Sequence, residues 1–170
     1  DLAETLKNAG HSIQVLTSLP HYPWWRTPHE FSHISEGRIH HDNIEIIRAQ
    51  HFIPKRFSAL VRMRFEFSLW WNLNRVLNSS NDIDIDLVIA VIPTVAAGLV
   101  ARKFATKLRV PFGLIVQDLS GAGAKQSGLK GGFLFSKIAK YVENSVVLRA
   151  NSLVGVSPAI SKVLKSVVGN

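Results

Sequence analysis

Residues 111–132 read PFGLIVQDLSGAGAKQSGLKGG, and this stretch decides the fold class. Its apolar run, residues 112–116, stops at Gln117 and Asp118, and a loop of glycine, alanine, serine and lysine follows. An apolar run between helical patterns is typical of a buried parallel strand. Ligands of open α/β sheets bind just beyond the carboxyl ends of such strands. We therefore expect Gln117, Asp118 and the start of the loop to belong to a functional site.

Strand and helix patterns alternate along the rest of the chain. Apolar spacing predicts helices at residues 2–9, 58–78, 94–106, 132–149 and 158–168. Apolar runs predict strands at residues 12–17, 44–48, 87–92, 112–117 and 153–156, with 38–40 as a further option. This order predicts the α/β class, with a Rossmann-like parallel sheet, helices on both faces, and a single domain over residues 1–170.

The start of the chain predicts an incomplete sheet. A doubly wound domain normally begins with a strand and a turn into its first helix, whereas helical spacing here begins at Leu2. We therefore expect the domain to be truncated at both ends and its first strand to be missing. That strand would lie between those at residues 12–17 and 87–92, which are then expected not to pair with each other.

Composition limits the classes of partner. The 170 residues include no cysteine, so disulfides and thiolate metal sites are excluded, and no apolar run is long enough to span a membrane. The net charge of +8 favours an anionic partner or general solubility. Zinc-finger spacing and RNA-binding aromatic motifs are absent, so no nucleic-acid partner is predicted. All seven histidines lie between His11 and His51 without a ligand pattern, so no metal site is predicted.

The helix predicted at residues 58–78 has two apolar stripes. The stripe expected in the core comprises Leu60, Val61, Phe65, Leu69, Leu73, Val76 and Leu77. A second stripe, here called the aromatic stripe, comprises Met63, Phe67, Trp70 and Trp71, and it lies beside Arg62 and Arg64. A helix on a sheet needs only one such stripe. The second must meet the long loop at 18–37, another chain, or an anionic membrane surface, and we take these six residues as membrane-facing candidates.

Four segments carry a family resemblance. They are LAETLKNAGHSIQVLTSLPHYP (2–23), DIDLVIAVIPTVAAGLVARKFATKLRVPF (84–112), LIVQDLSG (114–121) and NSLVGVSPAISKVL (151–164). Together they resemble the N-terminal domain of family-four retaining glycosyltransferases of the GT-B fold, in particular bacterial exopolysaccharide enzymes of the colanic-acid type. The resemblance covers essentially the whole chain in order.

The resemblance implies an acceptor-binding half of an enzyme. The family's C-terminal domain, which binds the nucleotide-sugar donor and carries two glutamates separated by seven residues, has no counterpart here, so the fragment is not expected to be active alone. The implied reaction transfers a sugar, with retained anomeric configuration, from a nucleotide-sugar to a glycan or lipid-linked acceptor in cell-surface polysaccharide biosynthesis. The donor is a substrate and no cofactor is implied. The implied location is cytoplasmic, with peripheral attachment to the inner face of the cell membrane left open.

The expected acceptor cleft joins residues from several strand ends. Its candidates are Gln117, Asp118, Ser120, Gly121, Pro93, Thr94, His21 and Tyr22. Many family members have histidine where Gln117 stands, and glutamine cannot titrate. Three plainer interpretations stay open: Asp118 braces a turn, residues 120–132 form a surface loop, and the aromatic residues at 22–25 fold back onto the domain.

Two other functions compete with the transferase. One is another GT-B enzyme, such as a nucleotide-sugar epimerase, which needs titratable groups in the cleft. The other is a basic, membrane-apposed binding domain without enzymatic activity. Sequence beyond residue 170 would discriminate, because a second Rossmann-like domain with the glutamate pair would support the transferase.

Overall fold

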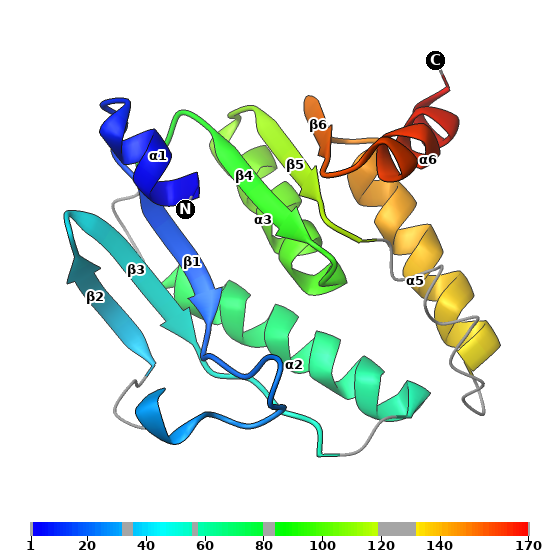
Figure 1. The fold of residues 1–170 in the computed structure, drawn as a ribbon, viewed down its shortest axis with the longest axis horizontal. Helices are drawn as coiled ribbons and strands as arrows, with labels where there is room; N and C mark the ends of the chain where they lie inside the picture. Colours follow the sequence, from blue (N-terminus) through cyan, green and yellow to red (C-terminus); the bar gives the residue numbers. More distant parts are fainter. Residues whose placement is uncertain (1, 32–35, 56–57, 80–83, 119–131, 170) are drawn as a thin grey trace.

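The computed structural model describes residues 2–31, 36–55, 58–79, 84–118 and 132–169, and it contains two three-stranded sheets with their helices (Figure 1). The elements, in chain order, are α1 (Leu2–Asn8), β1 (Gln14–Ser18), the 3-10 helix η1 (His29–Phe31), β2 (Gly37–His41), β3 (Ile44–Ala49), α2 (Ala59–Asn78), β4 (Val88–Ile92), α3 (Val95–Leu108), β5 (Phe112–Val116), α5 (Gly132–Val147), β6 (Ser152–Gly155) and α6 (Pro158–Val168).

One sheet is the parallel sheet that the sequence predicts. Its strand order is β4-β5-β6, and both pairs are parallel, with Leu114 beside Ala90 on one side and Leu153 on the other. Helices α3 and α5 connect these strands in alternation. The α/β class is therefore confirmed.

The other sheet is mixed and corrects the expectation of one parallel sheet. Strand β3 pairs with β1 in parallel and with β2 in antiparallel orientation. Strands β2 and β3 form a hairpin through Asp42 and Asn43, whose φ angles are 49° and 59°. A two-residue turn with both φ angles positive suits the twist of a hairpin, and Asp and Asn tolerate that conformation better than most residues. The optional strand at 38–40 is thus confirmed as part of β2, but it is antiparallel to β3.

The two sheets do not join. Strand β1 pairs with β3 and β4 pairs with β5, and no pairing connects β1 with β4. Figure 1 shows β1 and β4 as neighbouring edge strands that run in about the same direction. The expectation that these two strands are not paired is confirmed. A further strand between them stays a prediction.

Helix α2 packs against both the mixed sheet and helix α3, which covers the parallel sheet. Its buried side chains Phe65, Leu69, Leu73 and Leu77 form one cluster with Ala49 of β3 and with Ala96 and Val100 of α3. Ser58 caps the helix by accepting a hydrogen bond from the backbone N–H of Val61 at 3.2 Å. Five residues of the predicted core stripe lie in this cluster or pack against it, whereas Val61 is half-buried outside it and Leu60 is 77% exposed. Leu60 lies in the first turn of α2, outside the cluster that the helix forms with β3 and α3.

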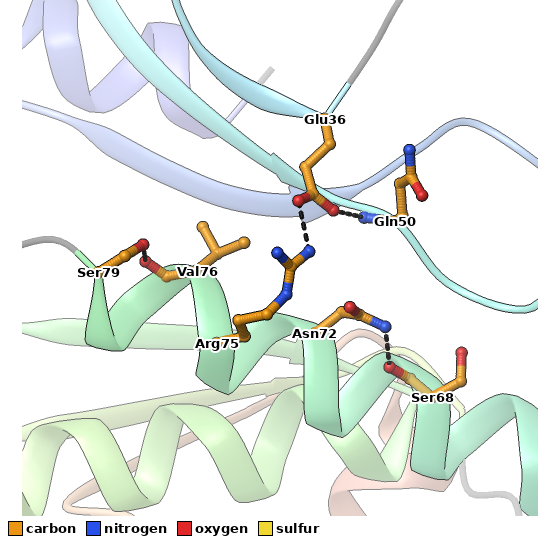
Figure 2. Close-up of polar contacts among 7 residues, drawn as sticks. All are labelled: Glu36, Gln50, Ser68, Asn72, Arg75, Val76 and Ser79. Atoms are coloured by element: carbon orange, nitrogen blue, oxygen red, sulfur yellow. Dashed lines mark hydrogen bonds and ion pairs between the residues drawn. The ribbon is translucent and has the colours of Figure 1, made fainter.

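A polar contact also fastens the mixed sheet to α2 (Figure 2). Glu36, just before β2, pairs with Arg75 of α2 and accepts a hydrogen bond from the backbone N–H of Gln50 at 2.9 Å. The bond from Gln50, and after it the pairing with Arg75, lowers the pKa of the Glu36 carboxyl. Three segments far apart in the sequence are therefore held together by one carboxylate.

Burial on the parallel sheet is one-sided. Ala90, Leu114 and Val116 are buried against a cluster that includes Val146 of α5 and Leu164 of α6. Side chains that alternate with the buried ones along β4 and β6 are more exposed: the exposed fractions are 40% for Ile89, 41% for Val91 and 51% for Val154. The expectation of helices on both faces is therefore not confirmed for the described part of the chain, and strand β4 is half-buried rather than fully buried.

Candidate functional site at the carboxyl ends of the strands

The ends of β4 and β5 meet at one edge of the parallel sheet. Ile92 and Val116 are register partners, and the backbone N–H of Gln117 donates to the carbonyl of Ile92 at 3.0 Å. This bond places Gln117 and Asp118 next to Pro93 and Thr94, as parallel strands require. Pro93, Gln117 and Asp118 are exposed, and Thr94 is half-buried. Ser120 and Gly121 lie outside the described residues, so the cleft assignment of these candidates stays a prediction.

Glu66 is a functional candidate that sequence reasoning missed. Thr94 is the N-cap of α3 but makes no side-chain cap bond. Instead, Glu66 reaches across from α2, and its Oε2 accepts from the backbone N–H of Ala96 at 3.0 Å. Its Oε1 accepts from Arg62, at 2.7 Å from Nη2 and 3.1 Å from Nε. A carboxylate thus already occupies the N-terminus of α3, the position that would otherwise favour a phosphate.

Burial dominates the electrostatics of Glu66. Burial raises its pKa, and the nearby Glu143 raises it further, while Arg62 and the N–H of Ala96 act in the opposite direction. Glu143 is 4% exposed and lies on α5. The only sequence signal for this arrangement is the spacing of Arg62 and Glu66, four residues apart on one helix face.

A ring cluster occupies the carboxyl ends of β1 and β3. His21 follows β1 and His51 follows β3, and their ring centroids lie 4.4 Å apart. The ring of Phe65 lies 5.5 Å from each of them. Trp25 packs edge-on against His21 at 5.8 Å and against Phe65 at 6.2 Å. Figure 1 shows β1, β3, β4 and β5 running in about the same direction, so the carboxyl ends of these strands in both sheets lie on the same side of the molecule.

His51 was not among the expected site residues, although it is the most perturbed histidine that the structure describes. Burial, and after it the charge of His21, lowers the pKa of His51 to about 4. Both ring nitrogens are buried and have no hydrogen-bond partner among the residues that the structure describes. The imidazole is therefore neutral at neutral pH, with one unused donor and one unused acceptor. The signal that could have found it is its position two residues after a strand that runs parallel to the one preceding His21.

The aromatic loop divides into two parts. His21 and Trp25 fold back onto α2, and His21 Nδ1 hydrogen-bonds the carbonyl of Leu19 at 3.2 Å. Tyr22 is 71% exposed and Trp24 is 50% exposed. The interpretation that the loop folds its rings onto the domain therefore holds for Trp25, while Tyr22 stays available to a ligand.

The aromatic stripe of α2 is largely exposed. The exposed fractions are 43% for Met63, 62% for Phe67 and 58% for Trp71, while Trp70 is half-buried against the core. Phe67 and Trp70, with Val95, Ala96 and Leu99 of α3, line an apolar hollow of about 340 Å³ between the two helices. The described part of the long loop does not bury this stripe.

The two arginines beside the stripe differ. Arg62 is held by Glu66 and is half-buried. Arg64 is exposed, and its guanidinium lies 4.2 Å from the ring centroid of Phe52. Of the two candidate cations, Arg64 is therefore the one that faces solvent.

The described residues contain no helix long and apolar enough to cross a membrane, and no group of three or more side chains arranged to hold a metal ion.

No protein-family model matches the chain, and no curated protein matches it at a significant level. The family resemblance therefore depends on the four quoted segments.

Proposed function

We propose that this chain is the acceptor-binding domain of a retaining glycosyltransferase. The enzyme transfers a sugar from a nucleotide-sugar donor to a glycan or lipid-linked acceptor in cell-surface polysaccharide biosynthesis, in the cytoplasm. The observation that carries the proposal is the hydrogen bond from Gln117 to Ile92, which sets two polar strand ends side by side at the carboxyl edge of a parallel sheet.

The chemistry of this edge suits a polyhydroxylated ligand. Gln117 and Asp118 offer an amide and a carboxylate, which bind hydroxyl groups through neutral and charge-assisted hydrogen bonds. Tyr22, in the loop after β1 of the mixed sheet, offers an exposed ring on which a sugar ring can stack. Glu66 at the start of α3 disfavours phosphate there, so this half of the site suits the acceptor rather than the donor diphosphate.

The test uses the full-length native protein, a panel of nucleotide-sugars and a lipid-linked or oligosaccharide acceptor. We expect glycosyl transfer, and we expect Asp118→Ala to lower turnover at least tenfold while unfolding free energy changes by no more than about 1 kcal/mol. Asp84→Ala, which removes an exposed carboxylate before β4, is the matched control and should leave turnover unchanged.

Two outcomes would overturn the assignment. Unchanged turnover in Asp118→Ala with a loss of stability would make Asp118 a turn-bracing residue. Conversion of the nucleotide-sugar into its epimer without any acceptor would favour the rival enzyme class.

The exposed aromatic stripe supports a second candidate function, attachment to an anionic membrane surface. Met63, Phe67 and Trp71 present apolar area to solvent on one helix, and Arg64 lies beside them. Apolar rings with cations on one surface are the components of interfacial binding, and each cation contributes about 1 kcal/mol at an anionic leaflet. This attachment would bring the domain to a lipid-linked acceptor, or would be the whole function of a non-enzymatic binding domain.

Sedimentation with vesicles tests this candidate. The wild-type protein should bind vesicles that contain anionic lipid and should dissociate as salt increases. Phe67→Ser with Trp71→Ser, and separately Arg64→Gln, should weaken binding, whereas Val163→Ser and Lys162→Gln on α6 are matched controls. Arg62 is left intact because its replacement would break the pair with Glu66. Equal binding by all variants would show that the stripe does not contact lipid.

A further inference from the structure

A basic cleft opens at the edge of the parallel sheet opposite to the proposed acceptor site. It lies where the C-terminal ends of α3 and α5 meet the amino-terminal ends of β5 and β6, at the upper side of the sheet in Figure 1. Its volume is about 440 Å³. Its polar and aromatic lining comprises Arg102, Thr106, Arg109, Phe112, Arg149 and Asn151. No carboxylate is among the described residues that line it.

Two of the polar side chains are held in place by the fold. Nη1 of Arg102 donates to the carbonyl of Ser145 at 3.2 Å and to its Oγ at 3.3 Å, so the guanidinium is anchored against α5. Oδ1 of Asn151 accepts from the backbone N–H of Phe112 at 2.8 Å. That bond fixes the orientation of the amide, because its Nδ2 cannot accept, and leaves the Nδ2 hydrogens as donors at the cleft.

The other two arginines are not neutralised. Arg109 and Arg149 are exposed, and neither has an ion pair or a side-chain hydrogen bond within the described ranges. Three guanidinium groups therefore share one cleft, and like charges at close range repel each other. The carbonyl ends of α3 and α5 ease this repulsion in the free protein, because helix C-termini favour cations. An anion bound in the cleft would offset the remaining repulsion between the three guanidinium groups.

The backbone at Arg109 adds a second, independent observation. Arg109 is the C-cap residue of α3 and has a left-handed conformation, with φ of 59° and ψ of 38°. Glycine takes this position most readily, and a residue with a Cβ is strained there. An arginine at this position therefore carries a conformational cost, and it places a free guanidinium at the mouth of the cleft.

We propose that this cleft binds a small phosphorylated molecule with at least two negative charges, of the pyrophosphate or phosphate-ester class. Each guanidinium group can donate two parallel hydrogen bonds to the oxygens of one phosphate, and the amide of Asn151 adds a further donor. The cleft is larger than one phosphate requires, and Ala105, Val110 and Phe112 give it an apolar wall for the remainder of the ligand. The site lies at the opposite edge of the sheet from Gln117, so it is separate from the proposed acceptor site.

Calorimetric titration of the full-length protein with inorganic pyrophosphate, at fixed ionic strength, tests the proposal. The wild-type protein should bind pyrophosphate more tightly than sulfate or chloride. Arg109→Gly and Arg149→Gln should each weaken binding at least fivefold, and the double variant should weaken it more than tenfold. Arg109→Gly should also leave the melting temperature unchanged or raise it, because it removes the left-handed strain, so lost binding cannot be ascribed to lost folding.

Matched controls and alternative ligands make the test decisive. Arg64→Gln and Lys162→Gln remove exposed cations from other surfaces and should leave pyrophosphate affinity unchanged. Equal affinity in wild type and in the double variant would overturn the proposal, as would the absence of any pyrophosphate binding. Binding of single-stranded nucleic acid, dependent on the same arginines, without binding of pyrophosphate, would replace it with a nucleic-acid surface. None of these outcomes depends on whether the protein transfers a sugar.

Discussion

At His51, a single side chain links burial to pH dependence. The unfolded chain protonates this imidazole near the ordinary pKa of about 6.5, whereas burial lowers the pKa in the folded protein to about 4. Between these values the unfolded state binds more protons, so the unfolding free energy falls as pH falls from about 7 to 4.5. We expect a loss of about 1–2 kcal/mol, less than the full shift implies because the residue is not wholly removed from solvent.

Chemical denaturation at pH 7 and pH 5 measures this loss. His51→Gln should remove this part of the pH dependence, because glutamine does not titrate. His11→Gln is the matched control, since His11 is exposed, and it should retain the wild-type dependence. An identical pH profile for wild type and His51→Gln would contradict the role given to burial.

Glu66 allows a second prediction at this scale. Glu66→Ala would leave the N–H of Ala96 without its acceptor and Arg62 without its partner, so we expect unfolding free energy to fall by about 1–3 kcal/mol. Glu66→Gln keeps an oxygen for Ala96 and should lose less. Urea denaturation measures both variants, with Asp84→Ala as the exposed control. Equal stability of Glu66→Ala and wild type would mean that the cap bond contributes nothing.

At the scale of elements, the two faces of α2 separate core from surface. Phe65 is 1% exposed and Phe67 is 62% exposed, although both are phenylalanines two positions apart. Phe65→Ala should lower unfolding free energy by about 3–5 kcal/mol through loss of contacts and a residual cavity. Phe67→Ala should change it by less than about 1 kcal/mol. Urea denaturation of the pair checks this, and a similar loss for both would show that the aromatic stripe is covered.

The same elements show how far sequence reasoning reaches. The helical spacing of apolar residues in 58–78 suffices to predict α2, because the pattern is long. The continuous apolar run 112–116 suffices to predict β5 and its burial, because the run is strongly apolar. The antiparallel β2–β3 hairpin escaped prediction because its signal is only the Asp42–Asn43 pair, and β2 is exposed along its whole length. The position of Gln117 directly after a predicted strand was enough to predict that it lies at the carboxyl edge of the sheet. The environments of His51 and Glu66 could not be predicted in this way, because they arise from packing between segments that are distant in the sequence.

At the scale of the whole molecule, two unpaired sheets depend on one helix. The buried residues of α2 contact Ala49 of the mixed sheet and Ala96 and Val100 of α3, and α3 in turn covers β4 and β5. The Glu36–Arg75 pair adds a polar link to the same helix. The two sheets share no ladder, so cooperativity between them must pass through this packing.

Leu73→Ala tests that coupling. Leu73 is 5% exposed at the centre of the shared cluster, and its truncation should lower unfolding free energy by about 2–5 kcal/mol. If α2 couples the halves, amide hydrogen exchange should accelerate by a similar factor in β3 and in β5, although Leu73 adjoins neither β5 nor β6 in the cluster. Leu164→Ala, in the separate cluster beneath the parallel sheet, is the matched truncation. Faster exchange confined to β1, β2 and β3 in Leu73→Ala would show instead that the two sheets unfold independently, with α2 belonging to the mixed sheet alone.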